Sequence, residues 1–194
     1  MKEIYFEEKM ITDQKLQKYA AERCKFIDCE FRNCSFEECS ITGCTFVNCK
    51  FTNCTIISLT SRYSEVKNAV FQKCNLIGVH WNDLLPSGKY AHSIDRLENC
   101  QIKYNTFSEM NFIRFHFSGN SIQESVFEQC NLSESDFLNC RLEGTQIFES
   151  DLRKADFRGA TRYLIDITSS KMKEARFSFP EAVNLLNSLG VKID

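Results

Sequence analysis

A period of five residues runs through most of this chain and constrains its fold more than any other feature. Seven cysteines stand at a strict interval of five from Cys24 to Cys54, and a large apolar residue such as Phe26 or Phe31 follows each by two positions. Each unit therefore reads small, polar, large apolar, polar, polar. This period fits neither an α-helix, with 3.6 residues per turn, nor a simple strand, which alternates every two residues. A backbone that turns a corner every five residues would point two side chains of each unit inward.

These units resemble the repeats of the pentapeptide-repeat family, and the resemblance covers Cys24 to Phe177 apart from one interruption. In that family four such sides form a square coil of about 20 residues. The resemblance implies an all-β fold, a right-handed quadrilateral β-helix, in which Phe26 would stack on Phe46. Because small residues would fill the space between the columns of large ones, we expect a core filled by side chains and without an internal cavity.

The register of the repeat divides the chain into segments of one solenoid domain. A first run of coils spans 24–81 and slips at Ser61, and a second run, one residue out of phase, spans 97–177, fails at Arg162 and resumes at Ile167. Residues 1–23 form either a lead-in helix capped by Thr12 or a degenerate first coil, and either would cover that end. Residues 82–96 form a projecting loop, and residues 178–194 form a C-terminal capping helix with its tail.

The eleven cysteines allow two interpretations, packing or metal and redox chemistry. Disulfide frameworks and zinc sites use irregular or CxxC-type spacings, whereas a constant interval indicates one structural position within a repeat. Free cysteine is a small apolar residue that is readily buried. The spacing therefore favours packing.

The loop at 82–96 contains Pro86-Ser87-Gly88, a turn signal, and does not follow the repeat. It is either a tolerated surface insertion or an interaction element. Apolar and amphipathic residues on an exposed loop are candidate anchors for a partner. The candidate partner-binding residues of this loop are Leu84, Leu85, Lys89 and Tyr90.

The C-terminal segment departs from the repeat. Ser178 to Glu181 reads as a capping box with a proline in the first turn, and Gly190 is a natural helix stop. The apolar face of this helix would close the end of the solenoid. The resemblance to the family implies in addition that the segment could support a homodimer, for which the cap residues are Val183, Leu186 and Leu189.

The sequence carries no motif for catalysis, a cofactor or a metal. It contains no phosphate-binding loop, no dinucleotide fingerprint, no HExxH and no nucleophile elbow, and its histidines are His80, His92 and His116. We therefore expect a protein that is not an enzyme. A net charge of -2 argues against direct nucleic-acid binding, and the absence of a signal peptide or membrane span predicts a cytoplasmic protein.

One side of the second run collects acidic residues. The outward positions of its units at 105–109, 125–129, 145–149 and 165–169 contain no lysine or arginine. This acidic stripe is either a solvated face or a binding surface. Its members are Glu109, Glu128, Glu149 and Asp166.

The resemblance extends to one subgroup of the family, the microcin immunity and quinolone-resistance proteins. It rests on the single loop after the first coils, the run from Asp151 to Phe157, and the segment from Leu185 to Val191. That subgroup binds type II topoisomerases, DNA gyrase and topoisomerase IV, and protects them from poisons by imitating DNA. The resemblance implies that this chain does the same, without a cofactor and with the acidic stripe as the mimic. The alternative is a generic repeat scaffold or interaction module without a topoisomerase role.

Overall fold

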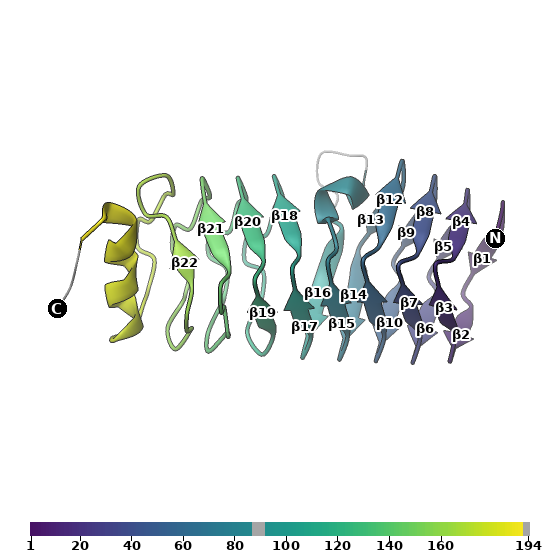
Figure 1. Cartoon of the computed structure of the whole chain (residues 1–194), viewed down its shortest axis with the longest axis horizontal. Helices are drawn as coiled ribbons and strands as arrows, with labels where there is room; N and C mark the ends of the chain where they lie inside the picture. The colour runs from purple at the N-terminus through teal and green to yellow at the C-terminus, as the bar shows by residue number, and fades with distance from the viewer. Residues whose placement is uncertain (87–91, 192–194) are drawn as a thin grey trace. The chain divides into compact units, whose positions relative to one another are not determined.

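The computed structural model describes residues 1–86 and 92–191 of the chain. Its contacts divide the chain into two compact units, Met1–Gln101 and Ile102–Asp194. We call them the N-terminal unit and the C-terminal unit. Each is a right-handed quadrilateral β-helix built from short parallel strands (Figure 1).

The N-terminal unit consists of three-residue strands joined by corners, and four consecutive strands form one coil. The first four strands show that the segment before residue 24 is a coil rather than a helix. The strands are β1 (Tyr5–Glu7), β2 (Met10–Thr12), β3 (Lys15–Gln17), β4 (Ala20–Glu22), β5 (Lys25–Ile27), β6 (Glu30–Arg32), β7 (Ser35–Glu37), β8 (Ser40–Thr42), β9 (Thr45–Val47), β10 (Lys50–Thr52), β11 (Thr55–Ile57), β12 (Thr60–Arg62), β13 (Glu65–Lys67), β14 (Ala69–Gln72), β15 (Asn75–Ile77) and β16 (Ile94–Glu98), with the 3₁₀ helix η1 (Trp81–Leu84) between the last two.

Equivalent strands of successive coils pair in parallel with the expected offset. Phe6 pairs with Phe26, and Phe26 pairs with Phe46, each 20 positions further on. Their rings stack with centroids 5.4 and 4.8 Å apart, at the spacing of neighbouring strands. The five-residue period therefore sets both the pairing register and the aromatic columns, as the sequence predicts.

The last residue of each five-residue unit, where the chain turns a corner, lies in the left-handed region of backbone conformation. Asparagine tolerates this region better than most residues. Asn33, Asn48 and Asn53 have φ close to 52°. The Asn53 side-chain amide donates to Asn33 Oδ1 at 2.8 Å, and that of Asn48 donates to Asp28 Oδ1 at 2.9 Å. These ladders of amides satisfy the polar corners and tie one coil to the next.

The eleven cysteines are free thiols with buried side chains. Cys49 is representative, since its thiol donates to the carbonyls of Phe26 and Val47 at 3.4 and 3.5 Å. Burial raises the pKa of Cys49, Cys130 and Cys140 to about 12. A thiol that stays protonated at neutral pH is a poor nucleophile and metal ligand, so these residues are suited to packing.

The interior of the N-terminal unit is not filled, which corrects the expectation of a core without a cavity. An apolar cavity of about 280 Å³ follows the axis of the coils and is lined by residues from Met1 to Leu84. Its wall includes Ala21, which occupies a central position where the two flanking sides carry Leu16 and Phe26. Phe36 and Phe46 remain half-buried within the strands β7 and β9, because they border this space.

The C-terminal unit closes several of its corners with a backbone hydrogen bond. The amide of Ala155 donates to the Leu152 carbonyl at 3.0 Å, and that of Ala160 donates to the Phe157 carbonyl at 3.0 Å. These bonds join the first and fourth residues of a turn. The strands of this part of the chain are β17 (Gln101–Lys103), which begins at the unit boundary, β18 (Thr106–Ser108), β19 (Ser121–Gln123), β20 (Val126–Glu128), β21 (Gln146–Phe148) and β22 (Leu164–Ile165).

The core of this unit is densely packed. Phe117, Phe137 and Phe157 have no more than a trace of exposed surface and stack with centroids 4.4 and 4.6 Å apart. Buried serines occupy small positions and link coils, since Ser150 Oγ accepts from the Cys130 amide at 3.0 Å and donates to the Phe148 carbonyl at 2.9 Å. The small positions therefore fill space and satisfy backbone groups together.

The repeat resumes differently from the sequence expectation after Arg162. Tyr163 turns into the core, and Ile147 pairs with Ile165, 18 positions further on, rather than with Ile167. Because Arg162 remains exposed, its charge stays in water while the shortened coil places Tyr163 against Phe157. The expected centre at Ile167 is thus wrong, and this side chain is only half-buried.

The C-terminal helix η2 (Glu181–Leu189) is present as expected, as a 3₁₀ helix that contacts β22. It ends at Gly190, whose φ of 69° is left-handed and whose amide donates to the Asn187 carbonyl. The expected capping box does not form. The Ser178 hydroxyl instead accepts from the Gly159 amide at 2.7 Å, and Glu181 accepts from the Arg162 amide at 3.1 Å. These groups attach the helix to the preceding coil.

Candidate functional site

The acidic stripe lies along one sheet of the C-terminal unit, in the order β18-β20-β21-β22. Each coil contributes one carboxylate at or just after the end of its strand, where the side chain leaves the sheet. Glu109 and Glu149 are exposed, and Glu128 and Asp166 are half-buried. The structure therefore brings all four predicted residues together on one face.

The carboxylates of the stripe lack a neutralising partner. Among the described residues, no lysine or arginine forms an ion pair with any of the four. Several other acids of this unit are paired, as in Arg114 with Glu134 at 2.9 Å and Arg153 with Asp151 at 2.6 Å. The four acids along this sheet thus carry negative charge that no ion pair neutralises.

Asp166 stabilises a turn through hydrogen bonds in addition to carrying a negative charge. Its Oδ1 accepts from the Thr168 amide at 2.8 Å and from the Thr168 hydroxyl at 2.6 Å, while its Oδ2 accepts from the Ser169 hydroxyl at 2.8 Å. These hydrogen bonds lower the pKa of Asp166 to about 2. The carboxylate therefore stays ionised throughout the neutral range, and it orders the turn after β22.

Glu128 and Glu149 accept fewer hydrogen bonds than Asp166 does. Glu149 accepts from the side-chain amide of Gln129 at 2.7 Å, and Glu128 accepts from the Ser108 hydroxyl at 3.3 Å. Uncharged donors orient these carboxylates without cancelling their charge. The stripe is therefore an array of oriented anions that can accept hydrogen bonds from cationic groups of a partner.

The loop residues predicted from the sequence to bind a partner differ in their exposure to solvent. Leu84 is only 2% exposed and packs inside the N-terminal unit, which corrects its proposed role as a surface anchor. It turns inward because η1 covers the cavity beneath Trp81. Leu85 is 40% exposed and stays available to a partner. Lys89 and Tyr90 lie outside the described residues.

The helix η2 offers the apolar side chains expected of a dimer contact. Leu186 and Leu189 are exposed, and Val183 is half-buried. The structure adds Phe179, 84% exposed, which sequence reasoning missed. Its position directly before Pro180, at the point where the repeat ends, was the available signal.

Two further expectations concern metal ions and membranes in the described part of the chain. Within residues 1–86 and 92–191, no group of three histidine, cysteine or acidic side chains is arranged to hold a metal ion. In the same ranges, no helix has both the length and the apolar character needed to cross a membrane.

Comparison with known proteins identifies the repeat. A model of the pentapeptide repeat region matches residues 96–162, and a model of eight pentapeptide repeats matches residues 22–56, which together cover more than half of the chain. No curated protein matches the sequence. Solved structures that align with it include QnrB1, a plasmid-mediated fluoroquinolone resistance protein, at 14% identity over 96% of this chain and 100% of that one, with a TM-score of 0.45. HetL from the cyanobacterium Nostoc aligns at 11% identity over 90% of this chain and 87% of that one, with a TM-score of 0.26. On the strength of the two family models, the chain belongs to the pentapeptide-repeat family.

Proposed function

We propose that this protein binds a type II topoisomerase, DNA gyrase or topoisomerase IV, and protects it from a toxin or a quinolone-type drug without catalysing a reaction. The acidic stripe would occupy part of the surface on which the enzyme holds DNA. The sequence features shared with the topoisomerase-protecting subgroup motivate the choice of partner. The single observation that carries the proposal is the unpaired negative charge along the sheet β18-β20-β21-β22.

The spacing of that charge is comparable with the spacing on DNA. Neighbouring strands lie about 4.8 Å apart, so one carboxylate per coil gives one negative charge per about 4.8 Å. A single DNA strand carries one phosphate per about 3.4 Å of helix axis. The stripe therefore resembles one strand of a duplex over a short distance, which is compatible with a modest net charge of -2 for the whole chain.

The direct test is a gyrase supercoiling assay with ciprofloxacin, with and without the protein. We expect the protein to restore supercoiling and to bind gyrase at micromolar concentration or below. Binding should weaken steeply as salt rises, because contacts to a DNA-binding groove release counterions and are screened. Absence of both protection and binding would discard the topoisomerase role and leave the generic repeat scaffold.

The stripe itself is tested by a quadruple variant, Glu109→Gln, Glu128→Gln, Glu149→Gln and Asp166→Asn. We expect gyrase affinity to fall by at least tenfold, together with the slope of its salt dependence. The matched control makes the same change in charge on the N-terminal unit, where the substitutions are Glu7→Gln, Glu8→Gln, Glu37→Gln and Asp28→Asn. Equal affinities of the two variants would remove the stripe from the proposal.

Two secondary contacts belong to the same proposal. The loop at 82–96, with Leu85 exposed among its described residues, would touch the enzyme, and η2 would join two copies of the chain through Leu186 and Leu189. Shortening the loop should reduce protection while the fold is kept. Leu186→Lys should convert a dimer into a monomer in sedimentation velocity, and a wild-type protein that is already monomeric would refute the dimer.

A further inference from the structure

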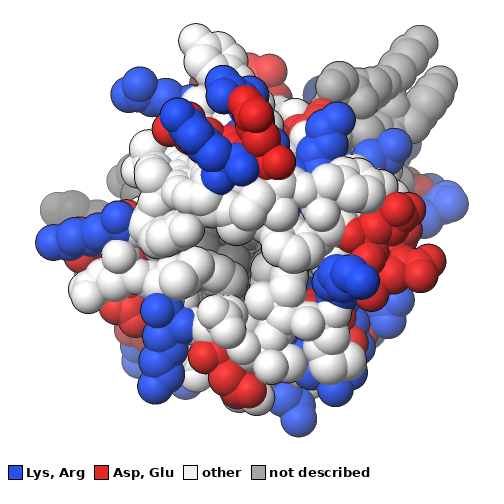
Figure 2. All heavy atoms as spheres, turned by 90° about the vertical axis from the view of Figure 1, so that its right-hand side faces the viewer, with Lys and Arg blue, Asp and Glu red and all other residues white. Residues whose placement is uncertain are grey.

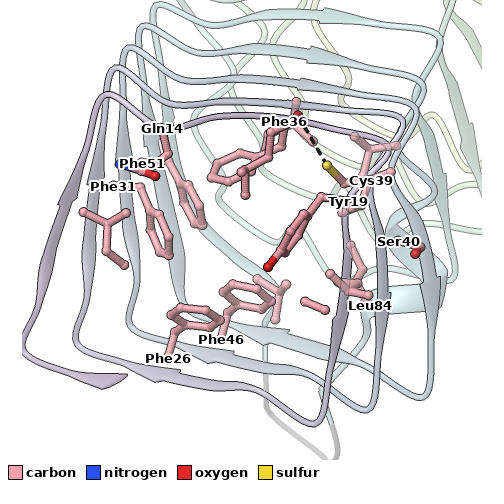
Figure 3. A pocket seen from close by; sticks show the side chains of 18 of the residues that line it. Gln14, Tyr19, Phe26, Phe31, Phe36, Cys39, Ser40, Phe46, Phe51 and Leu84 are labelled. Carbon is pink, nitrogen blue, oxygen red and sulfur yellow. Dashed lines mark hydrogen bonds between the residues drawn. The ribbon is translucent and has the colours of Figure 1, made fainter. Parts of the chain in front are cut away.

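The apolar cavity of the N-terminal unit is a second feature that the acidic stripe does not explain. It opens beside the first coil, where Phe6, Ile11 and Leu16 are only half-buried. Figure 2 shows this end as a hollow surrounded by uncharged side chains, with the charged residues at the periphery. Figure 3 shows aromatic and aliphatic side chains of successive coils pointing into the space.

The cavity exists because one column of central positions carries too little side-chain volume. Ala21, Ile41 and Ser61 pair in one column across β4, β8 and β12. Ala21, which lines the cavity, leaves unfilled the volume that a phenylalanine occupies in the column of Phe31 and Phe51 on the opposite side of the coil. Trp81 and Leu84, both almost fully buried, form the closed end of the space.

The cavity runs along the coils. Its lining residues come from four successive coils, and three steps at the strand spacing give a depth of about 14 Å. A cavity of this depth with an apolar lining accommodates an extended hydrocarbon chain along its axis.

The lining makes the cavity unsuitable for water. Phenylalanine, isoleucine and leucine side chains provide almost none of the two to four polar partners that an ordered water needs, and apolar cavities of this kind stay dry and take up apolar molecules. A second copy of the chain would not fill it, because the edge of a coil is flat and its inward side chains point along its own interior. An occupant must therefore be slender enough to enter.

Tyr19 places a polar group at the mouth of the cavity, whose lining also includes Gln14 and Ser40. Tyr19 occupies a small, inward-facing position of the first coil, and Figure 3 shows its ring reaching into the opening with the hydroxyl at its tip. Within residues 1–86 and 92–191, no side chain or backbone group forms a hydrogen bond with that hydroxyl. A phenol at the entrance of an apolar channel can donate to a carboxylate or accept from an alcohol.

We propose that the N-terminal unit binds a medium-length, unbranched aliphatic chain with one polar end, as in a fatty acid. The hydrocarbon fills the channel between Phe26, Phe46 and Ile41, and the polar end lies at the mouth beside Tyr19. This site is independent of the acidic stripe, which belongs to the other unit.

The test uses the full chain and dodecanoate, kept below the concentration at which it forms micelles, in isothermal titration calorimetry. We expect one dodecanoate per chain. Ala21→Phe and Ile41→Phe each add an aromatic ring inside the channel and should weaken binding at least tenfold. Thr12→Phe adds the same ring on the outside of the first coil and should leave the affinity unchanged.

Two further results bear on the proposal. Tyr19→Phe removes only the hydroxyl, and we expect it to weaken dodecanoate binding several-fold. The proposal is overturned if wild-type protein does not bind dodecanoate, or if both channel-filling variants bind it as wild type does. Circular dichroism of each variant distinguishes loss of binding from loss of folding, and either filling variant suffices if the other fails to fold.

Discussion

In the C-terminal unit the corner amide of Ala155 donates to the carbonyl of Leu152, whereas the equivalent amide of Cys49 in the N-terminal unit forms no such bond with Phe46. Both corners contain a left-handed residue, at Lys154 and at Asn48. The two units thus share the sequence pattern and the positive φ angle at these corners. Of these two corners, only the one in the C-terminal unit is closed by a backbone hydrogen bond. The five-residue period alone therefore does not determine how tightly a coil is wound.

The interiors of the two units also differ, and the unit with closed corners is the more tightly packed. In the C-terminal unit, Phe137 is fully buried between two other rings, whereas Phe46 of the N-terminal unit is half-buried beside a cavity. Small residues at central positions and open corners occur together in the hollow unit. We infer that the same five-residue repeat can form either a packed core or a core with a cavity. The volume of a few central side chains decides between them.

The strongest test of this difference compares two phenylalanines at central positions of their units. Phe137→Ala should destabilise the protein by about 3 to 5 kcal/mol, because it empties a closed core. Phe46→Ala should cost about 2 kcal/mol less, since one side of its ring already faces empty space. Urea denaturation measures both free energies of unfolding, and equal losses would contradict a difference in packing between the units.

The pH dependence of stability should be common to both units. Burial raises the pKa of Cys49, Cys130 and Cys140 to about 12, above the value of about 8.5 for an unfolded thiol. The unfolded chain therefore loses protons first as pH rises, so the contribution is complete below about pH 8.5 and is lost progressively toward pH 12. At pH 10 each thiol should have lowered the free energy of unfolding by about 2 kcal/mol.

Thermal denaturation between pH 7 and pH 10 measures this effect, with Cys49→Ser and Cys140→Ser as variants that each remove one thiol. Each should flatten the alkaline loss by a similar amount. A variant that leaves the alkaline loss unchanged would show that its thiol is less protected in the folded chain than its burial indicates.

A smaller effect is expected from adding volume at small positions. Ala155→Leu should cost about 1 to 3 kcal/mol, because the filled core has no room for the added carbons. Cys39→Leu, beside the cavity, should change stability by less than about 1 kcal/mol or increase it. Melting temperatures of the two variants rank them, and a larger loss at Cys39 would reverse the comparison.

The sequence was sufficient to predict the fold because the period is directly tied to backbone geometry. A small and then a large inward residue in every five is enough to predict the stacking of Phe26 on Phe46. The shortened coil at Arg162 was missed, since the pattern alone cannot distinguish a tolerated charge from two skipped residues. Tyr163, an aromatic residue directly after the failed position, was the signal.

The sites were predictable only in part. The alignment of Glu109, Glu128 and Glu149 followed from the coil length, because outward side chains keep their side of the square. The cavity could not be predicted, since a pattern of small and large residues does not report summed volume or the closure of corners. Leu84 illustrates the same limit, because an apolar loop residue reads alike whether it covers a core or faces solvent.

Xenon provides the most direct test of the difference between the two interiors, because it enters dry apolar cavities without a polar anchor. Methyl NMR spectra under xenon pressure should show shifts for Ala21, Leu16 and Ile41 in the N-terminal unit, and none for the buried Ile122, Leu132 and Leu142 in the C-terminal unit. Unshifted methyls in the first group, or equal shifts in both, would contradict a hollow unit beside a filled one.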